Sequence, residues 1–213
     1  MSGNSGRTVA QAIAEYGAGA RDRLRPWLQS LGAERRLSHL ALLAFKHERR
    51  LELWARVQGI WRYVRVYQIV AASGGPGPKL REGDRQVPEG VYRVVALNPN
   101  SHFHLSMRLD FPNDFDRLRA REEGRGQPGS DIFIHGCTQS VGCLAIGNTA
   151  IEELFVLCHD VGYANVSVVI APNDLRVCSA ITDPRSAPPW TAELYELIRD
   201  ELAAFPPQSF VAT

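Results

Sequence analysis

IFIHGCTQSVGCL, residues 132–144, is the most informative stretch of this 213-residue chain. An apolar run ends at His135, a short loop containing glycine and serine follows, and Cys143 stands just before the next apolar residues. Such a loop can turn the chain so that both side chains face one cleft. A cysteine needs a base or a positive neighbour to become a thiolate at neutral pH, and a histidine within reach supplies one. We therefore predict that Cys143 is a nucleophile and that His135 is its general base and acid.

The neighbours of these two residues predict supporting roles. Gly142 lets the backbone approach a substrate closely, and the amides of Val141, Gly142 and Cys143 can point at a developing oxyanion. Either Ser140 or the carbonyl of Gly136 can hold the imidazole in the required tautomer.

Other interpretations of the stretch stay open. A buried cysteine near a histidine can be inert packing. Zinc sites use four ligands at short, paired spacings, and that pattern is missing from the available set, so we expect no metal and no cofactor. Cys137 is a rival nucleophile, or a disulfide partner of Cys143 where the geometry allows one. The set considered for a metal is His135, Cys137, Cys143, Cys158 and His159.

Upstream of this stretch the chain is rich in strand patterns. Residues 39–46 are an apolar run, residues 51–57 alternate apolar and polar side chains, and residues 60–70 are rich in β-branched and aromatic types. These three segments predict an antiparallel meander. Residues 91–97 and 102–109 predict two further strands.

The segment 102–109 has one polar face that carries a further hypothesis. Because alternate residues of a strand share a face, His102, His104, Ser106 and Arg108 point the same way. We predict that His104, Ser106 and Arg108 line the substrate cleft, with Arg108 binding a carboxylate. The alternative is that this face is merely solvated.

Helices are predicted at both ends of the chain and once in the middle. Residues 8–31 predict two helical pieces, because Gly17, Gly19 and Pro26 interrupt the pattern. A capping box of Asn148-Thr149 with Glu152 predicts a helix that ends at Gly162. Residues 188–205 form an amphipathic pattern with Leu197 on its inner face, and residues 113–129 predict a loop.

The resulting fold class is mainly β with flanking helices (α+β). We expect an N-terminal helical appendage over residues 1–36, a catalytic domain over 37–185 and a C-terminal helix over 186–213 that packs on it. The glycine-rich residues 73–79 predict a surface loop, since the phosphate-binding pattern G-x-x-x-x-G-K-[ST] is missing.

Composition excludes several classes of protein. Lys and Arg number 24 and Asp and Glu number 23, so the formal charge of +1 argues against a nucleic-acid partner. No stretch approaches the roughly 20 apolar residues of a transmembrane helix. The N-terminus lacks the apolar segment of a secretory signal, which indicates a cytoplasmic start or a signal that has been removed.

Several motifs occur in order and point to one family. The segment His135–Cys143 reads H-G-x-x-x-S-x-G-C. Before it stand Gly77-Pro78-Lys79, Glu82-Gly83-Asp84-Arg85, Pro88-Glu89-Gly90-Val91-Tyr92, Leu97-Asn98-Pro99-Asn100-Ser101 and Phe103-His104-Leu105-Ser106. From about Leu40 to Ile170 this pattern resembles the L,D-transpeptidase catalytic domain (the YkuD family), in its YafK-like branch.

The resemblance implies a cradle-like β-sandwich catalytic domain with Cys143 as nucleophile and His135 as base. It also implies a periplasmic enzyme that acts on peptidoglycan stem peptides at meso-diaminopimelate through a thioester, and that carbapenems acylate. The commoner motif of the family reads S-H-G-C with a following Arg, whereas here Val141 replaces that second His and the loop has the short form of the branch.

The acceptor that resolves the thioester stays open. Transpeptidation uses an amine. The alternative is a hydrolase or amidase that trims stem peptides or releases peptidoglycan-linked lipoprotein. Two further hypotheses are a non-catalytic peptidoglycan-binding module and an enzyme delivered to the wall by a non-classical route.

Overall fold

Leu40–Phe45, strand β1, forms the centre of the fold because it is buried on both faces. Leu40, Leu42 and Ala44 enter one hydrophobic core, while Ala41, Leu43 and Phe45 enter a second core on the opposite face. The computed structural model describes residues 6–32, 37–182 and 187–208. The continuous apolar run predicted over residues 39–46 is thus a strand with no solvent-exposed face.

The described residues form one nine-stranded sheet in the order β3-β2-β1-β9-β5-β6-β7-β8-β4. The strands are β1 (Leu40–Phe45), β2 (Arg50–Val57), β3 (Ile60–Gln68), β4 (Ala71–Ala72), β5 (Gly90–Ser101), β6 (His104–Leu109), β7 (Phe133–His135), β8 (Leu144–Ala145) and β9 (Val166–Ala171). Strands β1, β2 and β3 pair antiparallel in succession, so the predicted meander is confirmed.

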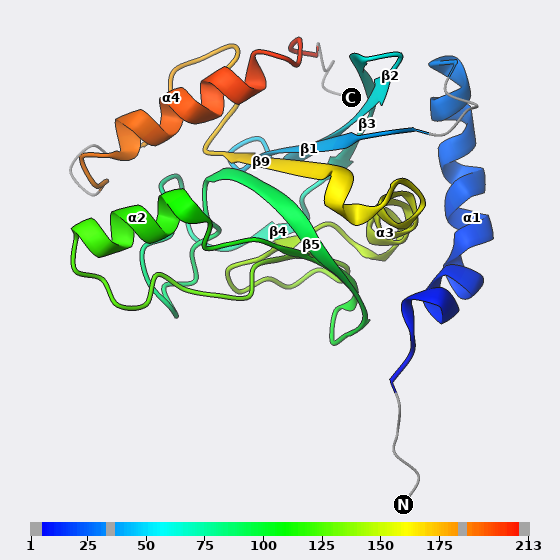
Figure 1. Ribbon diagram of the computed structural model, residues 1–213, viewed down its shortest axis with the longest axis horizontal. Coiled ribbons are helices and arrows are strands. Elements are labelled where there is room, and N and C mark those ends of the chain that lie inside the picture. Colours follow the sequence, from blue (N-terminus) through cyan, green and yellow to red (C-terminus); the bar gives the residue numbers. More distant parts are fainter. Residues whose placement is uncertain (1–5, 33–36, 183–186, 209–213) are drawn as a thin grey trace, which may run out of the picture.

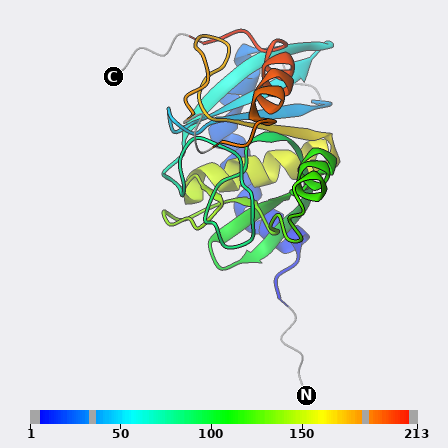
Figure 2. The same ribbon diagram turned by 90° about the vertical axis from the view of Figure 1, so that its left-hand side faces the viewer.

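The long strand β5 joins two halves of the sheet (Figure 1). Its first residues, Gly90–Arg93, pair with β9, and the residues from Val94 onward pair with β6. In the side view the yellow helix α3 (Asn148–Val161) runs between the upper strands and the green strands below (Figure 2). The mainly β fold with flanking helices is therefore confirmed, and its lower half carries the motif of residues 132–144.

Helix α1 (Val9–Ser30) is one helix, so the predicted division into two pieces is wrong. Pro26 lies inside it and removes one backbone donor. The helix continues because Ala12, Ala20 and Leu24 form one buried stripe across the expected break, and α1 packs along α3. Packing of a continuous apolar face outweighs the local helix-breaking residues.

Two other helix predictions need correction. Residues 113–129 contain helix α2 (Asp114–Glu122), which begins with a capping box between Asn113 and Asp116. Helix α3 begins after Gly147, without a side-chain cap, so the capping box predicted at Asn148-Thr149 is wrong. The Asn148 side chain instead accepts a hydrogen bond from the Cys137 backbone.

Helix α4 (Thr191–Leu202) covers the second core, on the side of β1 and β9 away from α3 (Figure 1). Leu194, Ile198 and Leu202 point inward, whereas Leu197 is 46% exposed, so its predicted place on the inner face is wrong. The predicted domain limits near residues 36 and 185 fall at segments 33–36 and 183–186, which lie outside the described residues. Among the described helices, none combines the length and the apolar character that crossing a membrane requires.

Candidate active site

Strand pairing brings several of the predicted site residues to one face of the lower half-sheet. Strands β7 and β8 are parallel, with His135 opposite Ala145. Registered neighbours point to the same side and alternate residues share a face, so continuing the β8 alternation back by one residue assigns Cys143 to the His135 face. Strand β6 places Ser106 opposite His135 and Arg108 opposite Phe133, on that same face.

His135 is 1% exposed, and its ring is held by two contacts. Nδ1 lies 2.7 Å from the Gly136 carbonyl oxygen. The Phe103 ring stacks on the imidazole, with centroids 4.5 Å apart. An imidazole that donates from Nδ1 to a carbonyl leaves Nε2 as the proton acceptor. Burial lowers the His135 pKa, and the Gly136 hydrogen bond opposes that shift, so the ring is neutral near pH 7.

The Cys143 thiol is half-buried, and its Sγ lies 3.8 Å from the Asp131 carbonyl oxygen. Burial raises the thiol pKa, whereas a hydrogen bond with the Phe133 backbone and the positive charge of Lys79 lower it in part. At neutral pH the group is therefore a thiol that requires a base to become a nucleophile.

The loop that carries Cys143 is held by serine hydroxyls. Gly142, at φ +88°, donates its N–H to Ser73 Oγ. The Cys143 N–H donates to Ser140 Oγ at 3.1 Å, and the Ser140 hydroxyl donates back to the Cys143 carbonyl. The sequence suggests two groups for orienting the imidazole. The Gly136 carbonyl contacts the His135 ring, whereas the Ser140 hydroxyl hydrogen-bonds with the Cys143 backbone.

Gly136 has no room for a side chain. A Cβ there would lie 2.7 Å from both the Phe103 carbonyl oxygen and Asn148 Oδ1. Asn148 accepts from the N–H of Cys137, which has a φ of +57°. The thiols of Cys137 and Cys143 are both free.

The three residues predicted to line the substrate cleft have different surroundings. Ser106 is 2% exposed and lies beside His135. Arg108 is half-exposed and pairs with Asp131 at 3.3 Å. His104 has a φ of +75° after an irregularity in the β5–β6 pairing, and its Nε2 lies 3.0 Å from Glu152. The strand alternation is broken at His104, which therefore faces α3 and α1 and is not grouped with the other two.

Sequence reasoning missed Lys79 as a site residue. Lys79 is buried, and its Nζ donates to Asp84 at 2.5 Å and to the Arg81 carbonyl at 3.0 Å. A Cβ built on Gly129 would lie 2.5 Å from Lys79 Cε, so the Lys79 side chain packs against Gly129. Two residues further on, the carbonyl of Asp131 contacts Cys143 Sγ. The signal was present in the motifs Gly77-Pro78-Lys79 and Glu82-Gly83-Asp84-Arg85, which carried no chemistry on their own.

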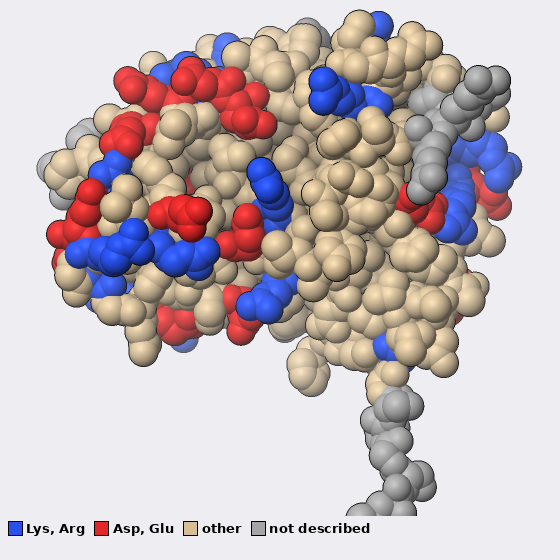
Figure 3. Space-filling view, in the orientation of Figure 1, with Lys and Arg blue, Asp and Glu red and all other residues tan. Residues whose placement is uncertain are grey.

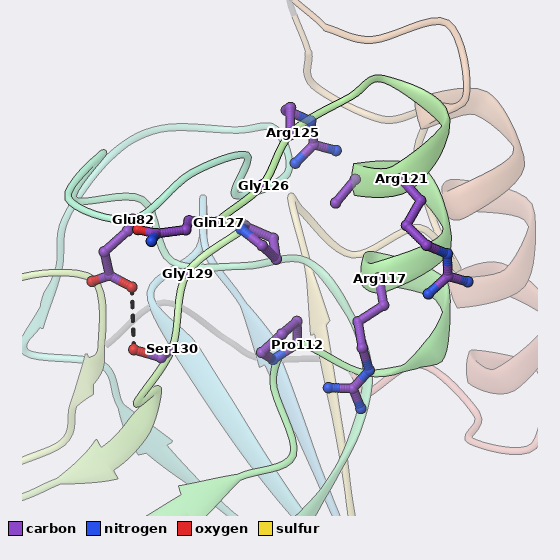
Figure 4. Close-up of a pocket in the computed structure, with 11 residues that line it drawn as sticks. Glu82, Pro112, Arg117, Arg121, Arg125, Gly126, Gln127, Gly129 and Ser130 are labelled. Carbon is purple, nitrogen blue, oxygen red and sulfur yellow. Dashed lines mark hydrogen bonds between the residues drawn. The ribbon is translucent and has the colours of Figure 1, made fainter.

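A cavity of about 590 Å³ opens beside this segment, between α2 and the loops around residues 82 and 126–130 (Figure 4). Its lining residues are Glu82, Pro112, Arg117, Ala120, Arg121, Arg125, Gly126, Gln127, Pro128, Gly129 and Ser130. In the described part of the chain, His, Cys, Asp and Glu side chains form no cluster of three or more suited to a metal ion.

Comparisons with known proteins agree on the family. Residues 41–170 match the family model for the L,D-transpeptidase catalytic domain (YkuD). The candidate L,D-transpeptidase YafK of Escherichia coli K12 is 38% identical over 113 residues, which are 52% of this chain and 44% of YafK. The matched segment therefore spans less than half of that relative.

Solved structures share the fold at low sequence identity. The helical cell shape determining protein Pgp2 from Campylobacter jejuni has a TM-score of 0.52 and 21% identity, over 70% of this chain and 55% of Pgp2. A structure of a Pgp2 mutant has a TM-score of 0.53 and 20% identity, over 73% of this chain and 57% of that one.

Proposed function

This chain belongs to the L,D-transpeptidase catalytic domain family, and we propose that it is a cysteine-dependent acyltransferase acting on peptidoglycan stem peptides. The bond attacked is the peptide bond on the carbonyl side of meso-diaminopimelate, and the first product is a thioester on Cys143. The observation that carries this proposal is the buried His135 at the end of β7, next to the strand that Cys143 precedes, with Nδ1 2.7 Å from the Gly136 carbonyl oxygen.

In the proposed first step, His135 Nε2 takes the Cys143 proton as Sγ bonds to the substrate carbonyl carbon. In the structure, the Gly142 N–H donates to Ser73 Oγ, and the Cys143 N–H donates to Ser140 Oγ. In the proposed step, one of these N–H groups donates to the oxyanion of the tetrahedral intermediate instead. The C–N bond then breaks, and His135 returns its proton to the leaving amine. The products of this step are a free amine and the acyl thioester.

The second step restores the thiol. An acceptor amine or a water molecule attacks the thioester carbonyl, and His135 takes its proton. The C–S bond then breaks and Cys143 is protonated again. We propose transpeptidation as the main reaction. Hydrolysis, including release of peptidoglycan-linked lipoprotein, is the alternative, and binding without turnover is a third possibility. In every case the proposed location is the periplasm, where the peptidoglycan substrate lies.

The test incubates the purified chain with disaccharide-tetrapeptides containing meso-diaminopimelate, with and without a lipoprotein C-terminal peptide linked to the sugar peptide. Products are identified by mass spectrometry, and a carbapenem adduct is sought on the intact protein. Cys143→Ala is expected to lower turnover at least about a thousandfold. Cys137→Ala is the matched control, because its thiol is also free and lies in the same loop.

Cross-linked dimers that disappear in Cys143→Ala and persist in Cys137→Ala support the transpeptidase. Tripeptides or freed lipoprotein peptide without dimers support the hydrolase instead. Peptide binding with neither product nor carbapenem adduct at Cys143 overturns the enzymatic proposal in favour of the binding module.

A further inference from the structure

The cavity beside α2 shares a wall with the nucleophile. Gly129 and Ser130 line the cavity, and the next residue, Asp131, places its carbonyl oxygen 3.8 Å from Cys143 Sγ. An extended peptide advances about 3.3 Å per residue. Because Gly129 and Ser130 are within two residues of Asp131, the near wall of the cavity lies within about 7 Å of backbone from the residue that contacts Cys143.

The cavity wall formed by α2 carries two exposed arginines, of which one has a single long ion-pair contact and the other has no partner among the described residues. Arg117 and Arg121 are four residues apart, so they project from the same side of the helix. Arg117 Nε lies 3.8 Å from Asp114, whose side chain is fully exposed. Among the described residues, Arg121 has no hydrogen-bond or ion-pair partner. Figure 4 shows both arginines coming from the helix, opposite Glu82 and Ser130.

The other charged groups of the cavity already have partners. Glu82 accepts a hydrogen bond from the Ser130 hydroxyl at 3.1 Å. Arg125 donates to Glu123 at 2.6 Å and also to the Leu80 carbonyl. The space-filling view shows blue and red side chains side by side over α2 and mostly red ones over α4 (Figure 3). The Ser130 hydroxyl does not neutralise the Glu82 carboxylate, so Arg117 and Arg121 outnumber one lining carboxylate and leave the cavity with a positive excess.

We propose that Arg117 and Arg121 bind a free carboxylate of the stem peptide in the cavity beside Cys143. The inference rests on the proposed function, since stem peptides carry free carboxylates at and next to meso-diaminopimelate. Guanidinium groups form charge-assisted hydrogen bonds with carboxylates, and two arginines in a partly enclosed cavity favour the acid over its amide. The cavity would thereby select stem peptides with free acids over amidated ones.

The test measures binding on the Cys143→Ala chain, so it does not depend on turnover. The probes are a meso-diaminopimelate tetrapeptide and the same peptide with its carboxylates amidated. We expect the acid to bind about tenfold more tightly than the amide, and Arg117→Gln/Arg121→Gln to remove that preference. Arg62→Gln is the matched control. Arg62 is exposed on β3, which is the edge strand farthest from β7 and β8 in the sheet order.

Equal affinity for acid and amide in the double variant, with the amide bound as tightly as by the parent, supports the inference. An acid preference that survives in the double variant overturns it, as does an equal loss of affinity for both peptides. The proposed function is tested apart from this, by Cys143-dependent product formation in the chain with its thiol intact. If the chain with its thiol intact turns over substrate while the double variant keeps its preference for the acid, the inference is wrong and the proposed function stays in place.

Discussion

At His135, burial and one hydrogen bond act in opposite directions on the imidazole pKa. Burial disfavours the charged imidazolium and lowers the pKa, while the Gly136 carbonyl favours the proton on Nδ1. The net effect is a lowered pKa, so the unprotonated base persists to lower pH than an exposed histidine would allow. A lowered pKa suits a residue that must accept a proton from a thiol.

Phe103→Ala is expected to move the acidic limb of the pH–rate profile upward. The Phe103 ring covers the imidazole, and its removal admits water, which relaxes the lowered His135 pKa toward its ordinary value. The fraction of neutral base at pH 6 then falls, while the rate at pH 8 changes less. The measurement is the rate of Cys143 acylation by a carbapenem from pH 5 to pH 8.

Phe115→Ala provides the control for this experiment, because Phe115 packs on Trp190, on the α4 side of the molecule. This variant should leave the midpoint of the acidic limb of the pH–rate profile unchanged. A downward shift in Phe103→Ala, or an equal shift in both variants, would contradict the account of His135.

At the scale of elements, a buried ion pair attaches the glycine-rich loop to the sheet. Lys46, directly after β1, donates to Glu89 at 3.0 Å and to the carbonyls of Gly77 and Val87. Glu89 also accepts from the Gly77 N–H at 2.8 Å and from the Tyr195 hydroxyl at 2.8 Å. The same loop contributes the Ser73 hydroxyl that contacts Gly142, so this pair positions one wall of the site.

Glu89→Gln is expected to lower the free energy of unfolding by about 3 kcal/mol at pH 7, since removing one partner leaves a buried charge uncompensated. Burial already lowers the Lys46 pKa, and Glu89 opposes that shift. Without Glu89 the folded state binds the Lys46 proton more weakly than the unfolded state does. Stability then rises with pH, and the deficit shrinks toward alkaline pH.

Urea unfolding of both proteins at several pH values measures this effect. Glu196→Gln, on the exposed face of α4, is the matched control and should change little. A deficit that stays constant or grows with rising pH would show that Lys46 is not the charge left unpaired.

The elements that sequence reasoning predicted well are those whose local pattern agrees with their burial. The meander of β1, β2 and β3 follows directly from its apolar and alternating runs. Helix α2 was missed because Arg and Asp dominate it, and its capping box at Asn113 and Asp116 was the one usable signal. The continuity of α1 depends on packing against α3, which no local pattern around Pro26 reveals.

The candidate site divides in the same way. His135 and Cys143 are predicted from their order and spacing along one stretch. Ser73 and Lys79 come from a loop 64 to 69 residues earlier, and only the folded chain brings them near Gly142 and Cys143. The face predicted for His104, Ser106 and Arg108 assumed unbroken alternation, which the positive φ of His104 interrupts.

For the whole molecule, the two hydrophobic cores are coupled through shared strands. Strand β1 sends alternate side chains into the core beside α3 and the core beside α4, and β9 does the same with Val168 and Val169. Strand β5 continues from β9 into the half-sheet that carries the site. Both cores depend on the same strands, so loss of packing in one core disturbs strands that the other core also needs.

We therefore expect one cooperative unfolding transition, with coincident midpoints for probes placed in the two cores. Tryptophan fluorescence reports on the core beside α4 in a Trp27→Phe background, because the three remaining indoles belong to that core or pack against it: Trp54, Trp61 and Trp190. Cys158 reports on the core beside α3, because its fully buried thiol becomes accessible to pulse labelling only on unfolding. The three other cysteines are replaced by alanine for that measurement. A labelling midpoint at lower urea than the fluorescence midpoint would mean that the site half unfolds on its own, and that sharing of β1, β5 and β9 does not couple the two cores.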